Sequence, residues 1–208
     1  MEGSFSAVTN YWIYDVLGRM HKCLDSYGRI IEMFSYDKDG RVSTRVDRNG
    51  THYNYTYDVR GRAVRVATPI SEEIREYDLR GNLVTRITDG RRVEQEFNCQ
   101  NQQVALRTFR GEDNQYDMTS WEYDNSTGLL LGTTYADGSK VHYRYSPDGL
   151  LLERTWARGI MTKYTYDANH RLTRIDYSDD TPTQTFQYDR LDRVMQLIVE
   201  GVTTNTIR

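Results

Sequence analysis

The sequence predicts an all-β protein, organised as a long antiparallel meander of repeated hairpins. Aromatic and polar residues alternate over short runs, as in THYNYTY at 51–57, which is the period of a half-buried strand. A turn signal and a second alternating run, RAVRV at 62–66, follow directly, as expected for a hairpin. The same pattern recurs along the whole chain, which is typical of repeat architectures.

Each repeat begins its turn with a Tyr-Asp pair. The pairs are Tyr14-Asp15, Tyr36-Asp37, Tyr57-Asp58, Tyr77-Asp78, Tyr123-Asp124, Tyr166-Asp167 and Tyr188-Asp189. Phe97-Asn98 and Tyr145-Ser146 are degenerate copies. The steps between successive anchors are 22, 21, 20, 20, 26, 22, 21 and 22 residues. We therefore interpret residues 1–208 as a single region of about nine hairpin repeats.

The Asp-x-x-Gly spacing predicts the form of the first turn. The Asp side chain accepts backbone N–H groups two residues on, and the glycine takes a positive φ. The turn glycines are Gly18, Gly40, Gly61, Gly81, Gly128 and Gly149. Asn101, His170 and Asp192 stand at this position in the other copies, and these residue types tolerate positive φ best. Asp124 reaches its glycine one residue later, which predicts a longer turn.

A second turn in each repeat is indicated by another glycine, nine or ten residues after the first turn site. These glycines are Gly28, Gly50, Gly90, Gly111, Gly138, Gly159 and Gly201. The runs between turns then have a normal strand length of about five to seven residues. In the longest step we expect Gly111 to Tyr116 to form an enlarged loop, with Tyr116-Asp117 as a false anchor.

The strands are expected to carry one apolar face. Aromatic residues stand two positions before most anchors and should share a face with them: Trp12, Phe34, Tyr55, Trp121, Tyr143, Tyr164 and Phe186. Apolar residues stand two positions after the turn site: Met20, Val42, Ala63, Leu83, Leu130, Leu151, Leu172 and Val194. These should form the matching face of the return strand.

The number of strands predicts curvature. Roughly 18 strands spaced about 4.8 Å apart would give a flat sheet roughly 85 Å long. Open sheets rarely pass about ten strands without curling or splitting. The strip should therefore close on itself, spiral, or form the wall of something hollow.

Composition narrows the class of protein. The chain has 17 Tyr against 5 Phe and 3 Trp, and tyrosine suits a half-buried or wet surface. The net charge of -3 comes from both signs mixed along the chain, so we expect no nucleic-acid partner. We also expect no membrane insertion and find no signal-peptide pattern at the N-terminus. Cys23 and Cys99 form neither a disulfide framework nor a metal set, and their redox state stays open.

The motif Tyr-Asp-x-x-Gly-Arg with a following aliphatic residue resembles the YD-repeat, or Rhs-repeat, family. The matching segments are YDKDGRV (36–42), YDVRGRAV (57–64), YDLRGNLV (77–84), YDANHRLT (166–173) and YDRLDRV (188–194). The family includes bacterial Rhs polymorphic toxins, C subunits of insecticidal toxin complexes, and teneurins. The resemblance implies a spiral, hollow β-shell that, in the toxins, encloses a C-terminal effector. The sequence shows no shell-closing motif. The resemblance therefore implies the wall of such a shell, and it does not imply the chemistry that releases the effector.

No pattern of residues predicts catalysis, a cofactor or a metal site. Asp37-x-Asp39-Gly40 looks like the start of a calcium loop, but its twelfth position is Arg48 rather than glutamate. The paired carboxylates Glu72-Glu73 and Asp179-Asp180 are expected in loops without a helper group. We therefore expect a protein that is not an enzyme.

Two functions stay open. The first is a structural segment that encloses and protects a toxin or effector polypeptide, secreted or at the cell surface as part of a larger protein. The second is a cell-surface module that binds carbohydrate or recognises another cell, with sugars stacking on Trp121, Tyr143 and Tyr164. In either case the open sheet edges should pair with the remaining repeats of the shell or with another copy.

Overall fold

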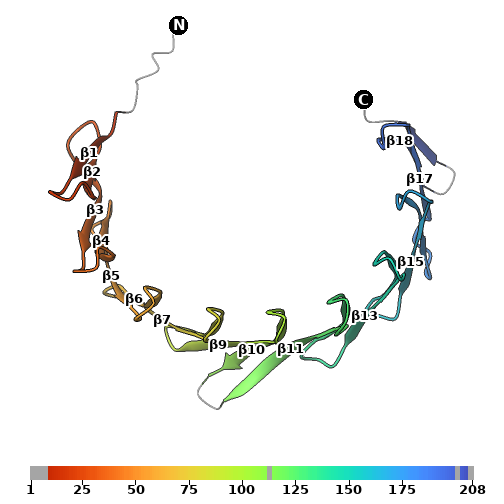
Figure 1. Cartoon of the computed structure of the whole chain (residues 1–208), viewed down its shortest axis with the longest axis horizontal. Coiled ribbons are helices and arrows are strands. Elements are labelled where there is room, and N and C mark those ends of the chain that lie inside the picture. The colour runs from red at the N-terminus through yellow and green to blue at the C-terminus, as the bar shows by residue number, and fades with distance from the viewer. Residues whose placement is uncertain (1–8, 112–113, 200–201, 206–208) are drawn as a thin grey trace, which may run out of the picture. The chain divides into compact units, whose positions relative to one another are not determined.

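The computed structural model describes residues 9–111, 114–199 and 202–205. Nineteen strands in this part of the chain belong to one antiparallel sheet, and the described residues contain no helix (Figure 1). The prediction of an all-β antiparallel meander is thus confirmed. Since it contains no helix, the described part also has none that could cross a membrane.

The contacts divide the chain into two units, Met1–Gln95 with Thr108–Gln115, and Glu96–Arg107 with Tyr116–Arg208. The strands that lie in or begin in the first unit are β1 Tyr11–Tyr14, β2 Met20–Leu24, β3 Ile30–Tyr36, β4 Val42–Asp47, β5 His52–Tyr57, β6 Ala63–Ala67, β7 Glu72–Tyr77, β8 Leu83–Thr88 and β9 Arg91–Phe97.

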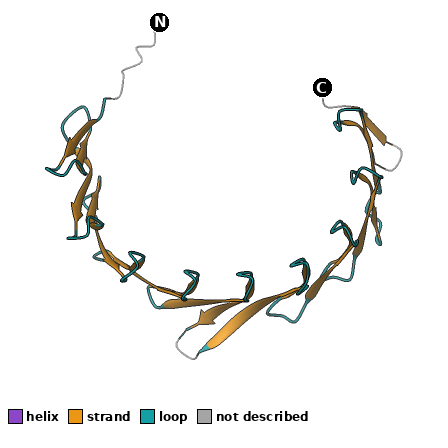
Figure 2. Ribbon diagram, viewed as in Figure 1, coloured by secondary structure: helices purple, strands orange, loops and turns teal. Residues whose placement is uncertain are grey.

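The remaining strands begin with β10 Gln103–Arg110, which contributes to both units. They continue with β11 Gln115–Tyr123, β12 Leu130–Thr134, β13 Lys140–Tyr145, β14 Leu151–Thr155, β15 Met161–Tyr166, β16 Leu172–Tyr177, β17 Gln184–Tyr188, β18 Val194–Val199 and β19 Val202–Asn205. Within each unit, every strand pairs with the next one along the chain. In each unit, taken by itself, the ribbon is a single layer that bends from strand to strand (Figure 2).

The register follows the repeat. Each anchor tyrosine lies opposite the apolar residue two positions after its turn site, as in Tyr57 with Ala63 and Tyr166 with Leu172. Next to the turn, the anchor and the apolar residue of the return strand therefore lie on the same face of the hairpin, as the sequence predicts. The whole set of such pairs is Tyr14–Met20, Tyr36–Val42, Tyr57–Ala63, Tyr77–Leu83, Tyr123–Leu130, Tyr145–Leu151, Tyr166–Leu172 and Tyr188–Val194.

An irregularity of the β-bulge type lies next to each of these pairs, for example between Thr56 and Tyr57. A bulge places two residues of one strand against one of its partner, so the return strand changes face beyond it. Arg45 consequently lies opposite both Phe34 and Tyr53, on the aromatic face. The sequence pattern did not indicate this change of face.

The sheet has little conventional core. Among the described residues, the buried hydrophobic side chains are Cys23, Val46, Ala105 and Val141. The anchor tyrosines from Tyr36 onward are half-buried, because a single layer buries side chains only against neighbours on the same face. Cross-strand contacts therefore have to supply the stability that a second layer would give in a sandwich.

Three expectations from the sequence need correction or fall outside the described residues. Gln115 and Tyr116 begin strand β11 instead of completing a loop, and the Arg107 guanidinium lies 5.7 Å from the Tyr116 ring centre. Glu72 and Glu73 belong to β7, because the Glu72 carbonyl accepts the Asp89 N–H at 3.0 Å and closes the hairpin. Gly201 lies outside the described residues.

The turns adopt the expected backbone conformation. Gly61 has φ of 81°, and Asn101, His170 and Asp192 have φ of 67°, 63° and 60°. Nothing lies within 4 Å of the position that a Cβ would take on Gly61. The requirement for glycine there is therefore one of backbone conformation and not of space.

We expect Gly61→Ala to lower the free energy of unfolding by about 1 kcal/mol, because an L-residue pays about 1–2 kcal/mol in the left-handed region. Urea unfolding followed by circular dichroism measures it. Val59→Ala is the matched control: Val59 is fully exposed in the same turn and should change stability by less than about 0.5 kcal/mol. Equal stability of the two variants would contradict the role of the turn.

Candidate functional site

The turn at Asp58 is closed by its carboxylate. One oxygen, Oδ1, accepts the backbone N–H groups of Arg60 and Arg62, both at 2.9 Å. The other, Oδ2, accepts Arg62 Nε at 2.7 Å. The Gly61 N–H also donates to the Asp58 carbonyl at 3.0 Å. The side chains of Asp58 and Arg62 thus hold the turn together from both ends.

The same arrangement recurs where an arginine follows the turn site. The further pairs are Asp15–Arg19, Asp37–Arg41, Asp167–Arg171 and Asp189–Arg193, each with a closest N–O distance of 2.7 Å. The backbone N–H of Arg62 is the main cause that holds the pKa of Asp58 below its usual 3.8, with burial acting in the opposite direction. The charged carboxylate is therefore part of the native turn.

Six of the turns are also joined to the preceding repeat by their anchor tyrosine. The Tyr57 hydroxyl donates to the carbonyl oxygen of Val42 at 2.7 Å, from strand β5 to strand β4. Corresponding bonds are Tyr36 to Met20 at 2.6 Å, Tyr77 to Ala63 at 3.1 Å, Tyr123 to Gln103 at 3.1 Å, Tyr166 to Leu151 at 2.9 Å and Tyr188 to Leu172 at 2.7 Å. The acceptor is in each case the residue two positions after the previous turn site.

The arginine of one turn covers the tyrosine of the next. The Arg41 guanidinium lies 4.8 Å from the Tyr57 ring centre, and its Nη1 donates to the Asp58 carbonyl at 3.4 Å. The other pairs are Arg19 with Tyr36 at 4.2 Å, Arg62 with Tyr77 at 4.6 Å and Arg171 with Tyr188 at 5.0 Å. We call this set of Asp, Arg, next tyrosine and acceptor carbonyl the repeat joint.

The repeat joint is incomplete in the middle of the chain. Asn82, Gln102, Leu129 and Leu150 occupy the arginine position, and Phe97 has no hydroxyl to donate. Gln102 still connects its own turn to the next one, because its Nε2 donates to the Gly128 carbonyl at 2.8 Å. The complete joints therefore lie on β2–β3, β4–β5 and β6–β7 in the first unit and on β16–β17 in the second.

The structure places the predicted Tyr, Asp and Gly positions in the turns and joints, but the arginine was not among the predicted site residues. Its signal was present in the sequence. Arginine directly follows the turn site in five copies, at Arg19, Arg41, Arg62, Arg171 and Arg193. Without the structure, these residues read as part of a solvated face.

The three residues predicted to stack on sugars are half-buried and lie on β11, β13 and β15. Tyr143 lies opposite Arg154, whose guanidinium is 5.6 Å from the Tyr143 ring centre and 3.3 Å from that of Trp156. Burial raises the pKa of Tyr164. The geometry joins Tyr143 to Arg154 in a packed cross-strand row, and sugar stacking on Trp121, Tyr143 and Tyr164 stays a prediction.

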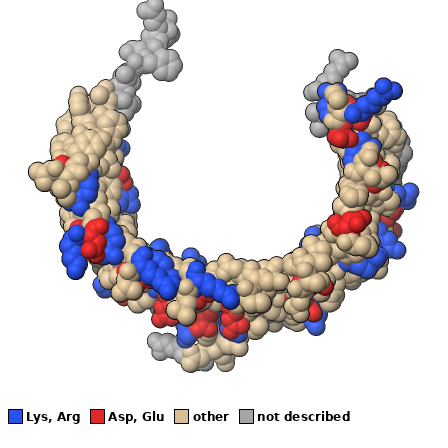
Figure 3. Space-filling view, viewed as in Figure 1, with Lys and Arg blue, Asp and Glu red and all other residues tan. Residues whose placement is uncertain are grey.

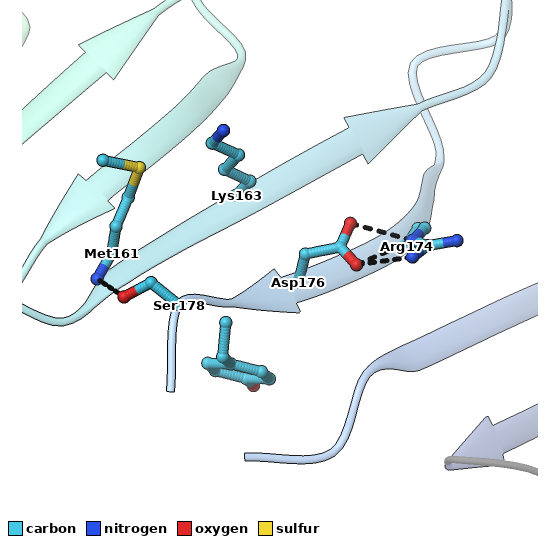
Figure 4. A pocket seen from close by; sticks show the side chains of 6 residues that line it. Met161, Lys163, Arg174, Asp176 and Ser178 are labelled. Carbon is cyan, nitrogen blue, oxygen red and sulfur yellow. Dashed lines mark hydrogen bonds and ion pairs between the residues drawn. The ribbon is translucent and has the colours of Figure 1, made fainter. Parts of the chain in front are cut away.

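A shallow depression of about 380 Å³ lies on the β15–β16 hairpin (Figure 4). Asp176 is the carboxylate in its lining, and Arg174 donates to it at 2.7 and 2.8 Å. The hydrogen bond from Arg174 is the main cause that lowers the pKa of Asp176, with Lys163 adding to the effect. A carboxylate held charged in this way is a poor proton acceptor at neutral pH.

Side chains of both charges are found along the described residues. On the face shown in Figure 3, basic and acidic side chains lie next to one another within each unit. In the described ranges, no group of three or more His, Cys, Asp or Glu side chains could hold a metal ion. The repeat joint is thus the arrangement of side chains that recurs most regularly.

We expect the protein to lose stability as the pH falls below about 4. The native pKa values of Asp15, Asp58 and Asp167 lie below the ordinary 3.8, so the unfolded chain takes up protons first. The stabilisation that these charged carboxylates give is fully present above about pH 4. It is lost as the pH falls through their lowered native pKa values. Urea unfolding at several pH values measures the effect.

The double substitution Asp58→Asn with Arg62→Gln is the control for the acid effect. It copies the natural turn of Asn98 and Gln102, in which Asn98 accepts the Gln102 N–H at 2.9 Å. This variant should lose less stability between neutral and acid pH than the unmodified chain. An unchanged difference would show that Asp58 does not contribute to it.

We expect Tyr57→Phe to loosen the joint between β4 and β5, because the Val42 carbonyl loses its hydroxyl donor at a cost of about 1 kcal/mol. Hydrogen exchange followed by mass spectrometry should show several-fold faster exchange of the amides in these two strands. Tyr27→Phe is the matched control, since Tyr27 is 82% exposed and lies outside the joints. Equal exchange in the two variants would contradict the joint.

Two segments of this chain match a known protein family. Residues 36–69 and 145–182 match the family model of the RHS repeat. These segments lie in the first and the second unit respectively. A search of curated proteins returned no match.

Among solved structures, the TcdB2-TccC3-Cdc42 crystal structure is 15% identical with a TM-score of 0.45, over 92% of this chain and 14% of that one. TcdB2-TccC3-TEV is 15% identical with a TM-score of 0.46, over 93% and 14%. A mutant of the Photorhabdus luminescens Tc holotoxin pore is 14% identical with a TM-score of 0.41, over 92% and 14%. This chain spans about one seventh of the length of those proteins. On the two matched segments, this chain carries repeats of the RHS, or YD-repeat, family.

Proposed function

We propose that this chain is a section of a YD-repeat wall that encloses and protects a polypeptide, such as a toxin or effector. The observation that supports the proposal is the repeat joint. In its complete form it connects neighbouring repeats at four places, as when Tyr57 bonds the Val42 carbonyl and is covered by Arg41. A unit of this kind extends a sheet without needing a second layer.

The physical properties of a single layer suit containment. The described residues bury few hydrophobic side chains, so the sheet has no interior in which to build a deep catalytic pocket. Its stability comes from many small cross-strand terms, each about 0.2–1 kcal/mol. Such a layer separates two spaces while its own structure stays the same along its length.

The chemistry of the joint also supports a structural role over catalysis. Five of the anchor carboxylates in the turns are paired with the arginine that follows the turn site, as in Asp58 with Arg62, and the carboxylate in the depression is paired with Arg174. We propose that the chain is not an enzyme. In this proposal it acts within a larger secreted or cell-surface protein, with the enclosed polypeptide and further repeats as its partners.

The proposal is tested by limited proteolysis of the full natural protein that contains this segment. The enclosed polypeptide should resist trypsin for as long as the repeats do. Opening a joint with the double substitution Tyr57→Ala and Asp58→Ala should expose it, so that it is cleaved at least about tenfold faster. Tyr27→Ala, at an exposed tyrosine outside the joints, should leave the protection unchanged.

Cleavage of the supposed cargo before the repeats in the unmodified protein would overturn containment. Binding to a glycan array or to cell-wall material, lost on substitution of Trp121, Tyr143 and Tyr164 by alanine, would instead support the recognition function. The two results are distinguishable because the joint variant and the aromatic variants alter different side chains.

A further inference from the structure

Arg154 on strand β14 is a cation without an acidic partner among the described residues. Its guanidinium lies 3.3 Å from the Trp156 ring centre and 5.6 Å from that of Tyr143. Its Nε is buried and has no hydrogen-bond partner. The described residues also give its Nη1 and Nη2 no partner, and these two atoms are not buried as Nε is. The charged end of the side chain is therefore open to solvent and unpaired.

The residues around Arg154 on its face of the sheet are uncharged. Tyr143 of β13 and Thr162 of β15 lie directly opposite Arg154. Val141 and Tyr164 stand two positions away from them on the same strands, and therefore share their face. Burial raises the pKa of Tyr164, and the positive charge of Arg154 acts against this rise. The arginine thus lies among aromatic, apolar and hydroxyl groups instead of carboxylates.

Arg45 holds the equivalent position in a repeat of the first unit. Like Arg154, it lies opposite the aromatic residue two positions before an anchor tyrosine, which here is Phe34. Its Nε and Nη2 donate to Oε1 of Glu32 at 2.9 and 2.6 Å. An arginine at this position of the repeat therefore binds a carboxylate when one is within reach.

The acidic positions around Arg45 are uncharged around Arg154. In the first case, one acidic residue stands four positions before the anchor tyrosine and another stands two positions after the arginine. The corresponding residues of the two repeats are Glu32 and Val141, and Asp47 and Trp156. The same cation is therefore present in both repeats, and its carboxylate is present in one.

The surroundings of Arg154 are held in place by the chain itself. The Trp156 indole N–H donates to the Thr162 hydroxyl at 2.9 Å, which fixes the ring against which the guanidinium lies. Thr162 is 2% exposed and Trp156 is 37% exposed. A guanidinium that stacks on an aromatic ring keeps its N–H edge free for planar anions. The Nη1 and Nη2 edge of Arg154 is therefore oriented before any ligand binds.

We propose that Arg154 binds the carboxylate of a glutamate or aspartate side chain from another polypeptide. Nη1 and Nη2 each donate one N–H to one of the two carboxylate oxygens, which is the paired geometry that guanidinium and carboxylate groups favour. The chain itself indicates this class of ligand, because glutamate fills the equivalent position at Arg45. A ligand from outside supplies the carboxylate that Val141 does not.

The source of the ligand rests on the proposed function, in which an enclosed polypeptide lies against the wall. The two proposals fail separately. Containment is tested through the repeat joints and the protection of the cargo from protease. The carboxylate site is tested through Arg154 and a short peptide, without any cargo.

A titration with a blocked glycine-glutamate-glycine peptide, followed by NMR, tests the site. The indole N–H of Trp156 gives one of three tryptophan indole signals, and the Trp156→Phe variant identifies it. We expect this signal to shift saturably with the glutamate peptide, because the ring contacts Arg154. The peptide with glutamine in place of glutamate should bind at least about tenfold more weakly, since it lacks the charge.

Arg154→Gln should weaken binding of the glutamate peptide at least about tenfold. Arg45→Gln is the matched control, because Arg45 has the same place in its repeat but is already paired with Glu32, and it should leave the affinity unchanged. Val141→Glu should also abolish binding, since it supplies the missing carboxylate within the chain. Circular dichroism spectra identify any variant that is unfolded, and the comparison of the two peptides needs no variant.

Equal affinity for the glutamate and glutamine peptides would overturn the proposal. Equal losses from Arg154→Gln and Arg45→Gln would overturn it as well, because the peptide would then bind elsewhere. Galacturonate offers the same carboxylate on a sugar. If it bound more tightly than the glutamate peptide, a polypeptide would be ruled out as the preferred ligand.

Discussion

Neighbouring repeats are tied together, where the joint is complete, by the contact between the arginine of one turn and the tyrosine of the next. Arg41 pairs with Asp37 in its own turn at 2.7 Å and lies 4.8 Å from the Tyr57 ring. One side chain therefore fixes the local hairpin and orients the next one. An exposed ion pair alone contributes little. Here the carboxylate also accepts two backbone N–H groups, so the pair is tied to the turn itself.

The double role of the arginine helps to explain how a sheet with few buried hydrophobic side chains is held together. A repeat protein is stabilised by each unit and by the interface to its neighbours. In this chain the interface consists of backbone pairing, aromatic rows and the repeat joint. Where the arginine is replaced, as at Leu129 and Leu150, the backbone pairing and the aromatic face remain. The chain thus tolerates degenerate copies, because no single joint holds more than two neighbouring repeats.

Much of the fold could be predicted from particular residues. Asp58 and Gly61 specify a turn by local chemistry, and alternation around Tyr53, Tyr55 and Tyr57 specifies the strand and its apolar face. The position of Gln115 and Tyr116 could not be predicted in this way, since their place in β11 depends on contacts such as Arg107 with Tyr116. The change of face at the bulge was missed for the same reason: a bulge is a property of two strands together.

The sequence by itself determined the period, the turn sites and the pairing of each hairpin, because turn geometry and alternation are local. Only the tertiary structure decided what the recurring Tyr, Asp and Arg residues do between repeats. The Tyr57 hydroxyl reaches the Val42 carbonyl at 2.7 Å across 15 residues, and Arg41 covers the same ring. Such contacts depend on the distance between strands and on the direction of side chains, which the period does not contain. The joint is therefore visible only once neighbouring repeats stand side by side.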